Sequence, residues 1–242
     1  MHLQRKMSFY EKYIKRFLDI LCSLLTIIVF SWAYVIIAVV VRIRMGSPVL
    51  FKQPRPGLIG IDGRETIFEM YKFRTMTDDR DAEGRLLPDA ERLPAFGKML
   101  RATSLDELPE VFNILKGDMS VIGPRPQLVR DMVFMSERQR MRHTAKPGLS
   151  GLAQVNGRNA ITWEEKIDWD LKYIEKVSFI GDLKIVAKTV QKVFGCGEQT
   201  EELDLNVDYG DWLLTSGKVS QRQYALLQKQ AMDLLGERKR AD

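Results

Sequence analysis

Two adjacent carboxylates, Asp106 and Glu107, are the residues whose types and spacing best suit chemistry in this sequence. They precede a short apolar helical pattern over residues 108–117. Pro109 predicts a helix that begins near Asp106, because proline is tolerated only in the first turn. Both carboxylates would then lie at a helix N-terminus, where the dipole favours their ionised forms. Taken alone, the stretch is equally typical of a cap, with Ser104 and Glu107 forming a capping box.

Basic residues stand at positions from which they could meet these carboxylates or an anionic substrate. Lys72 and Arg74 are two apart in a strand expected over residues 66–76, so both side chains should project from one face. Such a pair can be exposed surface charge. On a strand rich in Phe, Tyr and Met it also suggests anion binding.

Two arginines stand close to the acidic pair in sequence. A short helix expected over residues 94–102 would carry Arg101 towards the acidic pair, and Arg125 lies in the Gly-Pro-Arg-Pro stretch 123–126. The prolines stiffen the backbone around Arg125, and a rigid guanidinium suits bidentate phosphate recognition. The alternative is a structural turn in which Arg125 pairs with a carboxylate.

A glycine-rich segment, residues 146–158, has amide and guanidinium side chains near its end at Gln154, Asn156 and Arg158. Its length without a regular pattern predicts a binding loop.

Composition excludes several function classes. The 242 residues hold 37 Lys plus Arg against 32 Asp plus Glu, a formal net charge of +5 that suits phosphates or an anionic membrane face. The two cysteines, Cys22 and Cys196, form no disulfide framework, which indicates a reducing compartment. With only His2 and His143, Ser-His-Asp chemistry and a multi-histidine zinc site are excluded.

Residues 17–41 form an apolar run whose only charge is Asp19. The 22 uncharged residues 20–41 would extend roughly 33 Å as a helix, enough for a hydrocarbon core of about 30 Å. The run is too long for a cleaved signal peptide. Basic residues flank it on both sides: Lys12, Lys15 and Arg16 before it, Arg42 and Arg44 after it. The positive-inside rule therefore gives no orientation, and the segment either spans the membrane or re-enters the cytoplasmic leaflet.

The remaining patterns predict a small α/β domain with a short antiparallel sheet and several amphipathic helices. Strands are expected at residues 49–53 and 66–76, with a turn at Pro54–Gly57, and helices at 127–143, 162–177 and 182–194. The last helix has Lys184, Lys188 and Lys192 along one side, which fits either anionic lipid or an ordinary core-packed helix. We expect an anchor over residues 1–46, a catalytic domain over 47–194, and an acidic linker with a helical tail over 195–242.

Four motifs in order then carry a resemblance: Tyr-Lys-Phe-Arg-Thr-Met at 71–76, the Asp-Glu pair, Gly-Pro-Arg-Pro at 123–126, and Ala-Gln-Val-Asn-Gly-Arg at 153–158. Over about residues 9–194 the chain resembles the bacterial monotopic phosphoglycosyl transferases. The resemblance implies an enzyme anchored in the bacterial inner membrane that works at the cytoplasmic face. It would transfer a sugar-1-phosphate from a UDP-sugar to undecaprenyl phosphate and release UMP. N-acetylated amino sugars are the expected donors, although other members of the family take glucose or galactose.

The resemblance also assigns roles. It implies that Asp106 is the nucleophile and forms a phosphosugar-aspartyl intermediate, and that Glu107, with Asp106, holds Mg²⁺. A carboxylate is already ionised and needs no base, but it must approach a negative pyrophosphate, so Mg²⁺ and fixed cations are needed. Lys72, Arg101 and Arg125 match basic positions of the family. Within this resemblance we assign Gln154, Asn156 and Arg158 to nucleotide or sugar recognition. Inner-membrane lipids and downstream glycosyltransferases are the implied partners, and no nucleic acid is expected.

One feature departs from the family. Its membrane helix is usually broken by a Ser-Pro pair, whereas here Trp32 follows Phe30 and Ser31. A kink would need another cause, such as a bond from Ser31 to a preceding carbonyl. The basic residues on both flanks still favour re-entry.

Two other function classes are alternatives. A phosphatase with an aspartyl-phosphate intermediate would want a further acidic cluster behind Asp106, where only Glu107 and Glu110 stand. A membrane-tethered module that binds nucleic acid or lipid would spread its cations over a face with stacking aromatic residues. Here the cations instead gather near paired carboxylates.

Overall fold

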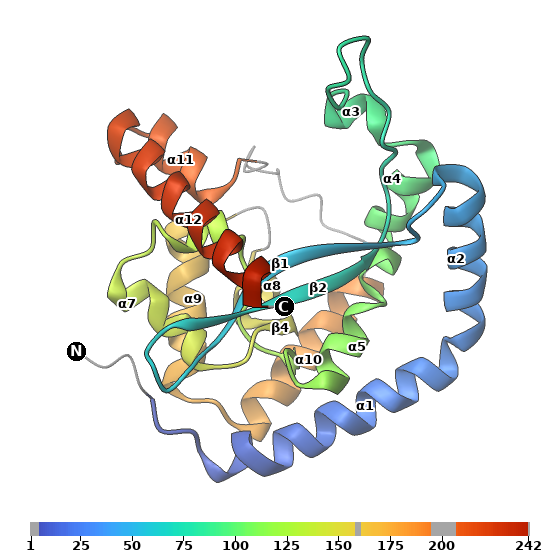
Figure 1. Cartoon of the computed structure of the whole chain (residues 1–242). Helices are drawn as coiled ribbons and strands as arrows, with labels where there is room; N and C mark the ends of the chain where they lie inside the picture. Colours follow the sequence, from blue (N-terminus) through green and yellow to red (C-terminus); the bar gives the residue numbers. More distant parts are fainter. Residues whose placement is uncertain (1–4, 158–160, 195–206, 242) are drawn as a thin grey trace. The chain divides into compact units, whose positions relative to one another are not determined.

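The computed structural model describes residues 5–157, 161–194 and 207–241 (Figure 1). The chain forms two compact units. Unit 1 comprises Met1–Asp19, Pro54–Phe68 and Gly117–Asp242, and unit 2 comprises Ile20–Gln53 and Glu69–Lys116. Each unit has its own buried apolar cluster. The domain boundaries expected at residues 46 and 194 stay predictions.

Unit 2 holds the acidic pair. Its elements, some of which begin or end in residues of unit 1, are α1 (Arg16–Val29), α2 (Ser31–Met45), β1 (Leu50–Ile59), β2 (Glu65–Phe73), α3 (Asp89–Arg92), α4 (Ala95–Ala102), the 3₁₀ turn η2 (Leu105–Glu107) and α5 (Glu110–Lys116). Its core joins α2 to the end of β2 and to α4 through Ile37, Val41, Met45, Phe73 and Leu100.

The turn expected at Pro54–Gly57 is wrong, because β1 continues through these residues to Ile59. In a two-stranded sheet every strand is an edge, so prolines whose missing N–H faces away from the partner are tolerated. The chain reverses later, at residues 60–64, where the N–H of Gly60 donates to the carbonyl of Arg64 at 2.8 Å. The second strand ends at Phe73, three residues before its expected end.

The apolar N-terminal segment is bent. Among the described residues, no single helix is long and apolar enough to cross a membrane, but Tyr10–Val29 and Ser31–Met45 pass that test as a pair bent by 65°. Phe30 stands at the break, where α1 and α2 meet in Figure 1. The Ser31 hydroxyl donates to the carbonyl of Ile28 at 2.9 Å. The expected bond from Ser31 to a preceding carbonyl is therefore confirmed, and it sits at the bend.

Unit 1 is mainly helical. Its further elements are the π-helical turn η1 (Tyr10–Lys15), β3 (Ser120–Ile122), α6 (Val129–Met132), α7 (Glu137–Arg140), the 3₁₀ turn η3 (Met141–Thr144), β4 (Gly148–Ser150), α8 (Leu152–Val155), α9 (Trp163–Glu175), α10 (Phe179–Phe194), α11 (Tyr209–Thr215) and α12 (Gln221–Ala241). The strands β3 and β4 pair in parallel, Ser120 with Gly148 and Ile122 with Ser150. The sequence predicted no such pair. A Cβ on Gly148 would stand 2.1 Å from the nitrogen of Gly123, so this close approach requires glycine.

The core of unit 1 packs α9 against β3, α8 and α11, with Ile122, Val155, Trp163, Ile167, Tyr209 and Leu213 among its members. The rings of Trp163 and Tyr209 lie 5.6 Å apart between centroids. The described part of the C-terminal tail therefore packs into the same core as α9. The acidic linker expected after residue 194 lies in residues 195–206, outside the described part of the chain.

Three further helix predictions have mixed outcomes. The helix expected over 127–143 is wrong, since the chain forms α6, α7 and η3 instead, and a capping box from Ser136 to Gln139 restarts the helix at α7. The loop expected at 146–158 contains β4 and α8. The two later helices are confirmed as α9, capped by Thr162 and Glu165, and α10.

Candidate active site

The acidic pair lies in η2, a short 3₁₀ turn, and not in the first turn of an α-helix. Because Pro109 has no N–H to continue the hydrogen bonding of η2, helix α5 begins afresh at Glu110. The expected capping box is also wrong. Ser104 adopts a left-handed conformation with φ +55°, and its side chain makes no capping bond. Its carbonyl instead accepts from the N–H of Glu107 at 3.2 Å.

Lys72 of β2 reaches the acidic turn. Its Nζ lies 2.7 Å from Oε1 of Glu107 and 3.2 Å from Oε1 of Glu110. The Glu110 side chain is only 2% exposed, and that of Lys72 17%. The sequence pattern suggested Glu110 only as a possible acid of a phosphatase and did not predict its contact with Lys72. Its spacing three residues after Glu107, which sets side chains on one helix face, was the available signal.

Asp106 is nearly buried, with 8% of its surface exposed. Burial raises the pKa of this carboxyl, while the positive charges of Lys72 and Arg101 oppose the shift. Glu107 adds to the rise through like-charge repulsion. Asp106 is thus a poorly hydrated carboxylate whose charge depends on two nearby cations, which suits a nucleophile more than a surface cap.

Asn113, fully buried in α5, fixes the distance between Lys72 and the turn. Its Oδ1 accepts from the N–H of Tyr71 at 3.0 Å, and its Nδ2 donates to the carbonyl of Glu69 at 2.6 Å. These two bonds, on either side of Met70, clamp α5 onto β2 close to Lys72. Tyr34 of α2 donates its hydroxyl to the carbonyl of Leu108 at 2.7 Å, which ties the bent segment to the same turn.

The other two cations predicted in unit 2, Arg101 and Arg74, differ in their hydrogen-bond partners. Arg101 lies in the last turn of α4, and its Nε donates to the hydroxyl of Thr75 at 3.0 Å. Arg74 lies beyond the end of β2 and is buried. It donates to the carbonyls of Met76 at 2.8 Å and Ser47 at 3.0 Å, and pairs with Asp78 at 2.6 Å. The substrate-binding roles of both arginines stay predictions.

Arg125 belongs to unit 1, where two other arginines hold its turn. Nη2 of Arg142 donates to the carbonyl of Arg125 at 2.6 Å, and Nη1 of Arg55 donates to the carbonyl of Pro126 at 3.1 Å. Arg142 is itself fixed by a buried ion pair with Asp170, at 2.5 Å. The turn at residues 123–126 is therefore held through its backbone carbonyls. A fixed backbone restricts the positions that the Arg125 guanidinium can take.

Two of the three residues predicted for recognition, Gln154 and Asn156, bond within unit 1. Gln154 Nε2 donates to the carbonyl of Leu149 at 3.0 Å. Asn156 donates to the carbonyl of Leu152 at 2.8 Å, and its Oδ1 accepts from Lys188 at 3.2 Å. Arg158 lies outside the described residues. The recognition roles of Gln154, Asn156 and Arg158 stay predictions.

His143 is buried and structural. Burial lowers its pKa to about 4, so the ring is neutral near pH 7. Its Nδ1 lies 3.0 Å from Oε1 of Glu65. Against the cost of burial, hydrogen bonds from His143 and Arg140 lower the pKa of Glu65 to about 2. An ionised Glu65 can only accept, so Nδ1 of His143 carries the proton.

Among the described residues, no group of three or more His, Cys, Asp or Glu side chains is placed to hold a metal ion. Mg²⁺ is commonly bound by one or two carboxylates together with substrate phosphates and water. The adjacent Asp106 and Glu107 supply that smaller donor set, so the residues present fit a magnesium ion that arrives with a phosphorylated substrate.

Comparison with known proteins identifies the family of this chain. The pattern that describes the bacterial sugar transferase family matches residues 10–196, which include every predicted site residue. An uncharacterised sugar transferase of Bacillus subtilis (strain 168) is 51% identical over 174 residues, 72% of this chain and 81% of the relative.

Two relatives have more specific names. A UDP-glucose:undecaprenyl-phosphate glucose-1-phosphate transferase of Klebsiella pneumoniae is 40% identical over 74% of this chain and 40% of its own length. A UDP-N-acetylgalactosamine-undecaprenyl-phosphate N-acetylgalactosaminephosphotransferase of Aeromonas hydrophila is 37% identical over 75% of this chain and 44% of its own. The chain thus spans less than half the length of these two proteins. With the family pattern matched over more than half of its residues, the chain belongs to the bacterial sugar transferases, the phosphoglycosyl transferase family that its four motifs resemble.

Proposed function

We propose that this protein transfers a sugar 1-phosphate from a UDP-sugar to undecaprenyl phosphate, giving a lipid-linked diphosphate sugar and UMP. The observation that carries the proposal is the arrangement of Asp106 beside Glu107 in η2, with Lys72 2.7 Å from Glu107. The named relatives, which act on UDP-glucose and UDP-N-acetylgalactosamine with undecaprenyl phosphate, support the reaction class.

Asp106 acts as the nucleophile. One of its carboxylate oxygens attacks the phosphorus that bears the sugar, and the bond from this phosphorus to the oxygen shared with UMP breaks. UMP leaves with the electron pair, and a phosphosugar-aspartyl intermediate remains. A phosphate oxygen of the lipid then attacks the same phosphorus and frees Asp106. Because Asp106 is nearly buried, its carboxylate loses little hydration when the pyrophosphate approaches.

Fixed cations offset the repulsion between Asp106 and the donor. The ammonium of Lys72 and the guanidinium of Arg101 both favour the ionised form of Asp106. Asp106 and Glu107 would hold a magnesium ion brought with the donor, and the bound ion would neutralise charge on the pyrophosphate and on departing UMP. The nearly buried Glu110 would still hold the ammonium group of Lys72 in place if Glu107 bound a magnesium ion.

For the donor we keep the expectation of an N-acetylated amino sugar, supported by the name of the Aeromonas relative. We place the protein at the inner membrane with its catalytic residues on the cytoplasmic side. The bent helix pair and its basic flanks support a segment that enters and leaves through one leaflet. The lipid-linked product would pass to downstream glycosyltransferases.

The test uses the full-length protein in detergent with Mg²⁺ and a panel of UDP-sugars, without a lipid acceptor. We expect one UMP per protein with the correct donor, and a matching mass increase on the peptide that contains Asp106. Multiple turnover then requires undecaprenyl phosphate. UMP release only after the lipid is added would point to direct attack by the lipid and overturn the covalent role of Asp106. Continuous UMP release without lipid would indicate a hydrolase with an aspartyl-phosphate intermediate.

A further inference from the structure

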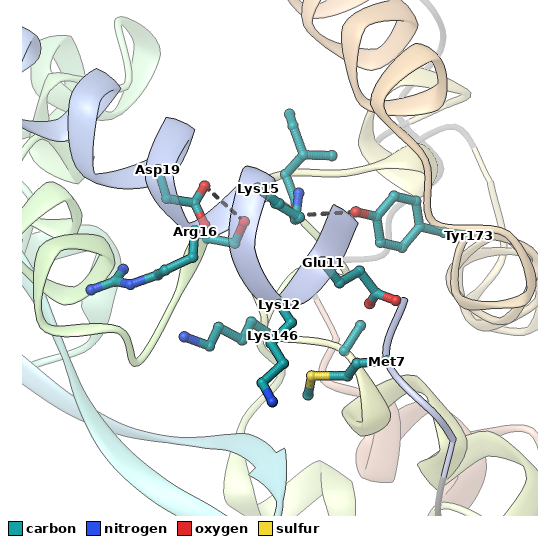
Figure 2. A pocket seen from close by; sticks show the side chains of 11 residues that line it. Met7, Glu11, Lys12, Lys15, Arg16, Asp19, Lys146 and Tyr173 are labelled. Carbon is teal, nitrogen blue, oxygen red and sulfur yellow. Dashed lines mark hydrogen bonds between the residues drawn. The ribbon is translucent and has the colours of Figure 1, made fainter. Parts of the chain in front are cut away.

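A cavity in unit 1 lies outside the site described above. Its volume is about 210 Å³, below the range of about 300–1,000 Å³ of pockets for drug-sized ligands. It would hold a small group and not a whole nucleotide sugar. Its lining comes from Met7 and the first helical segment, from β3, from the residues before β4 and from Tyr173 of α9 (Figure 2). The charged side chains in this lining are Glu11, Lys12, Lys15, Arg16, Asp19 and Lys146.

Both acidic groups of the cavity already have partners that hold the fold together. Asp19 accepts at 2.9 Å from the hydroxyl of Ser120 and from the N–H of Val121. Glu11 accepts from Arg5 and from the N–H of Ser8. Neither carboxylate therefore serves chiefly to neutralise the basic side chains that face the cavity.

The basic side chains that line the cavity have fewer partners of opposite charge close by at Lys146 than at Lys15. Lys15 pairs with Asp182 at 2.5 Å. No carboxylate of the described residues lies within ion-pair distance of Lys146, although Asp19 and Asp118 exert a longer-range attraction. Burial, followed by the like charge of Arg16, lowers the pKa of Lys146. Two cations that face each other in a half-buried space destabilise the fold, which is typical of a site built for an anion.

Gly117, which is not part of the cavity lining, shows how close Arg16 and Lys146 stand to each other. A Cβ at this position would stand 3.4 Å from Nη2 of Arg16 and also 3.4 Å from Nζ of Lys146. Two cationic groups that line the cavity are thus close neighbours. Gly117 also has φ +98°, as expected for the residue that follows a helix, so its backbone alone would favour glycine. A phosphate oxygen placed between the two nitrogens could accept from both.

The surroundings of the cavity indicate which phosphate it meets. The same segment exposes three aromatic side chains, Phe9 at 71%, Tyr13 at 53% and Phe17 at 65%. It leads directly into the apolar helix α1. Aromatic and basic residues at the end of an apolar segment are typical of the membrane interface, where phospholipid headgroups lie.

We propose that this cavity binds the phosphate of an anionic phospholipid headgroup between Arg16 and Lys146, with Lys12 at its open side. The proposal rests on the membrane location given under the proposed function. It assigns to the cavity an anchoring lipid that is not consumed in the reaction. A zwitterionic choline headgroup would bring a cation towards the basic lining and should bind less well.

The experiment measures the melting temperature of the full-length protein in a nonionic detergent. Short-chain phosphatidylglycerol, short-chain phosphatidylcholine and inorganic phosphate are added separately at equal concentrations. We expect phosphatidylglycerol at tenfold its Kd to raise the melting temperature by about 3–5 °C. Lys146→Gln should lose at least half of this rise, while Lys229→Gln, which removes an equal charge from the exposed face of α12, should keep it.

Lys146→Gln carries a second signature. Because the charged form of Lys146 is disfavoured in the fold, the variant without lipid should melt no lower than the wild type, whereas loss of a structural ion pair would lower its melting temperature. Should the variant fail to purify, Lys12→Gln, an exposed position, should also weaken the response to phosphatidylglycerol.

An unchanged response in Lys146→Gln would overturn the proposal. An equal rise with inorganic phosphate would make the cavity a free-anion site, and an equal rise with phosphatidylcholine would remove the preference for anionic lipid; both would overturn the assignment. The UMP burst, measured on the same preparations, separates this result from the proposed function. A normal burst with an unchanged lipid response would refute the cavity assignment alone, and a missing burst with the expected response would refute the transferase alone.

Discussion

The ammonium of Lys72 lies 2.7 Å from Oε1 of Glu107, which joins the strand β2 to the acidic turn η2. This one contact brings together two of the four sequence motifs. It also places a positive charge where the charge of Asp106 depends on it. The contact therefore links the stability of unit 2 to its proposed chemistry.

Replacing Lys72 by Met should lower both activity and stability. Loss of the cation beside the proposed reaction centre should reduce the rate of UMP formation at least about a hundredfold. The nearly buried Glu110 would lose its lysine, which should lower the free energy of unfolding by about 3 kcal/mol. Initial rates and denaturant unfolding in detergent measure the two effects.

The double variant Lys72→Met/Glu110→Gln separates the two roles. Removing both charges should recover most of the lost stability, because the nearly buried carboxylate that paired with Lys72 is then neutral as well. Activity should stay low. Recovery of activity together with stability would assign Lys72 a structural role only.

Asp106→Asn should abolish transfer without harming the fold. The rate should fall about a thousandfold or more, since an amide cannot form the covalent intermediate. Burial raises the pKa of Asp106, so the neutral amide should leave the melting temperature unchanged or higher. Asp168→Asn on the exposed side of α9 is the control. Near-normal turnover by the Asp106 variant would remove it as the nucleophile.

Proline should be accepted at Trp32 but not at Val35. Trp32 lies in the first turn of α2, where a helix tolerates proline, whereas Val35 lies further inside the helix. Both side chains are about equally exposed, 64% each, so burial does not distinguish the two sites. Membrane-inserted yield and labelling of Cys22 from either side of the membrane measure the outcome. Loss of insertion with Trp32→Pro would contradict a bent segment.

Acid should weaken unit 1 through His143 and Glu65. The pKa of His143 is about 4 in the fold against 6.5 when unperturbed, so the unfolded chain binds the extra proton between these values. The neutral ring contributes to the free energy of unfolding above pH 6.5. This contribution falls as the pH drops towards 4, by on the order of 2–3 kcal/mol. Glu65 has a pKa of about 2 in the fold against 4.5 when unperturbed, so the free energy of unfolding falls further as the pH drops below 4.5.

The melting temperature between pH 7.5 and 4 follows this loss. His143→Gln keeps a side-chain donor for Glu65 but cannot titrate, so its curve should be flatter between pH 6.5 and 4. A parallel curve for the variant would show that another group carries the acid sensitivity.

Local sequence patterns determined much of this protein. The four ordered motifs identified the family, now shown by the match over residues 10–196. The capped helix α9, the amphipathic α10, the short helix α4 that carries Arg101 and the bend at Ser31 were all predictable. Each depends on residues within a few positions of one another, through periodicity, caps and prolines.

Only the tertiary structure decided how distant segments meet. Glu110 became a partner of Lys72 because Asn113 clamps α5 onto β2, and no local pattern encodes that pairing. Arg74 has the strand spacing of Lys72, yet β2 ends at Phe73 and backbone carbonyls capture its guanidinium. The prolines of β1 were misjudged as a turn because an edge strand tolerates them. Such outcomes depend on which surfaces pack together, and a pattern of neighbouring residues does not contain that information.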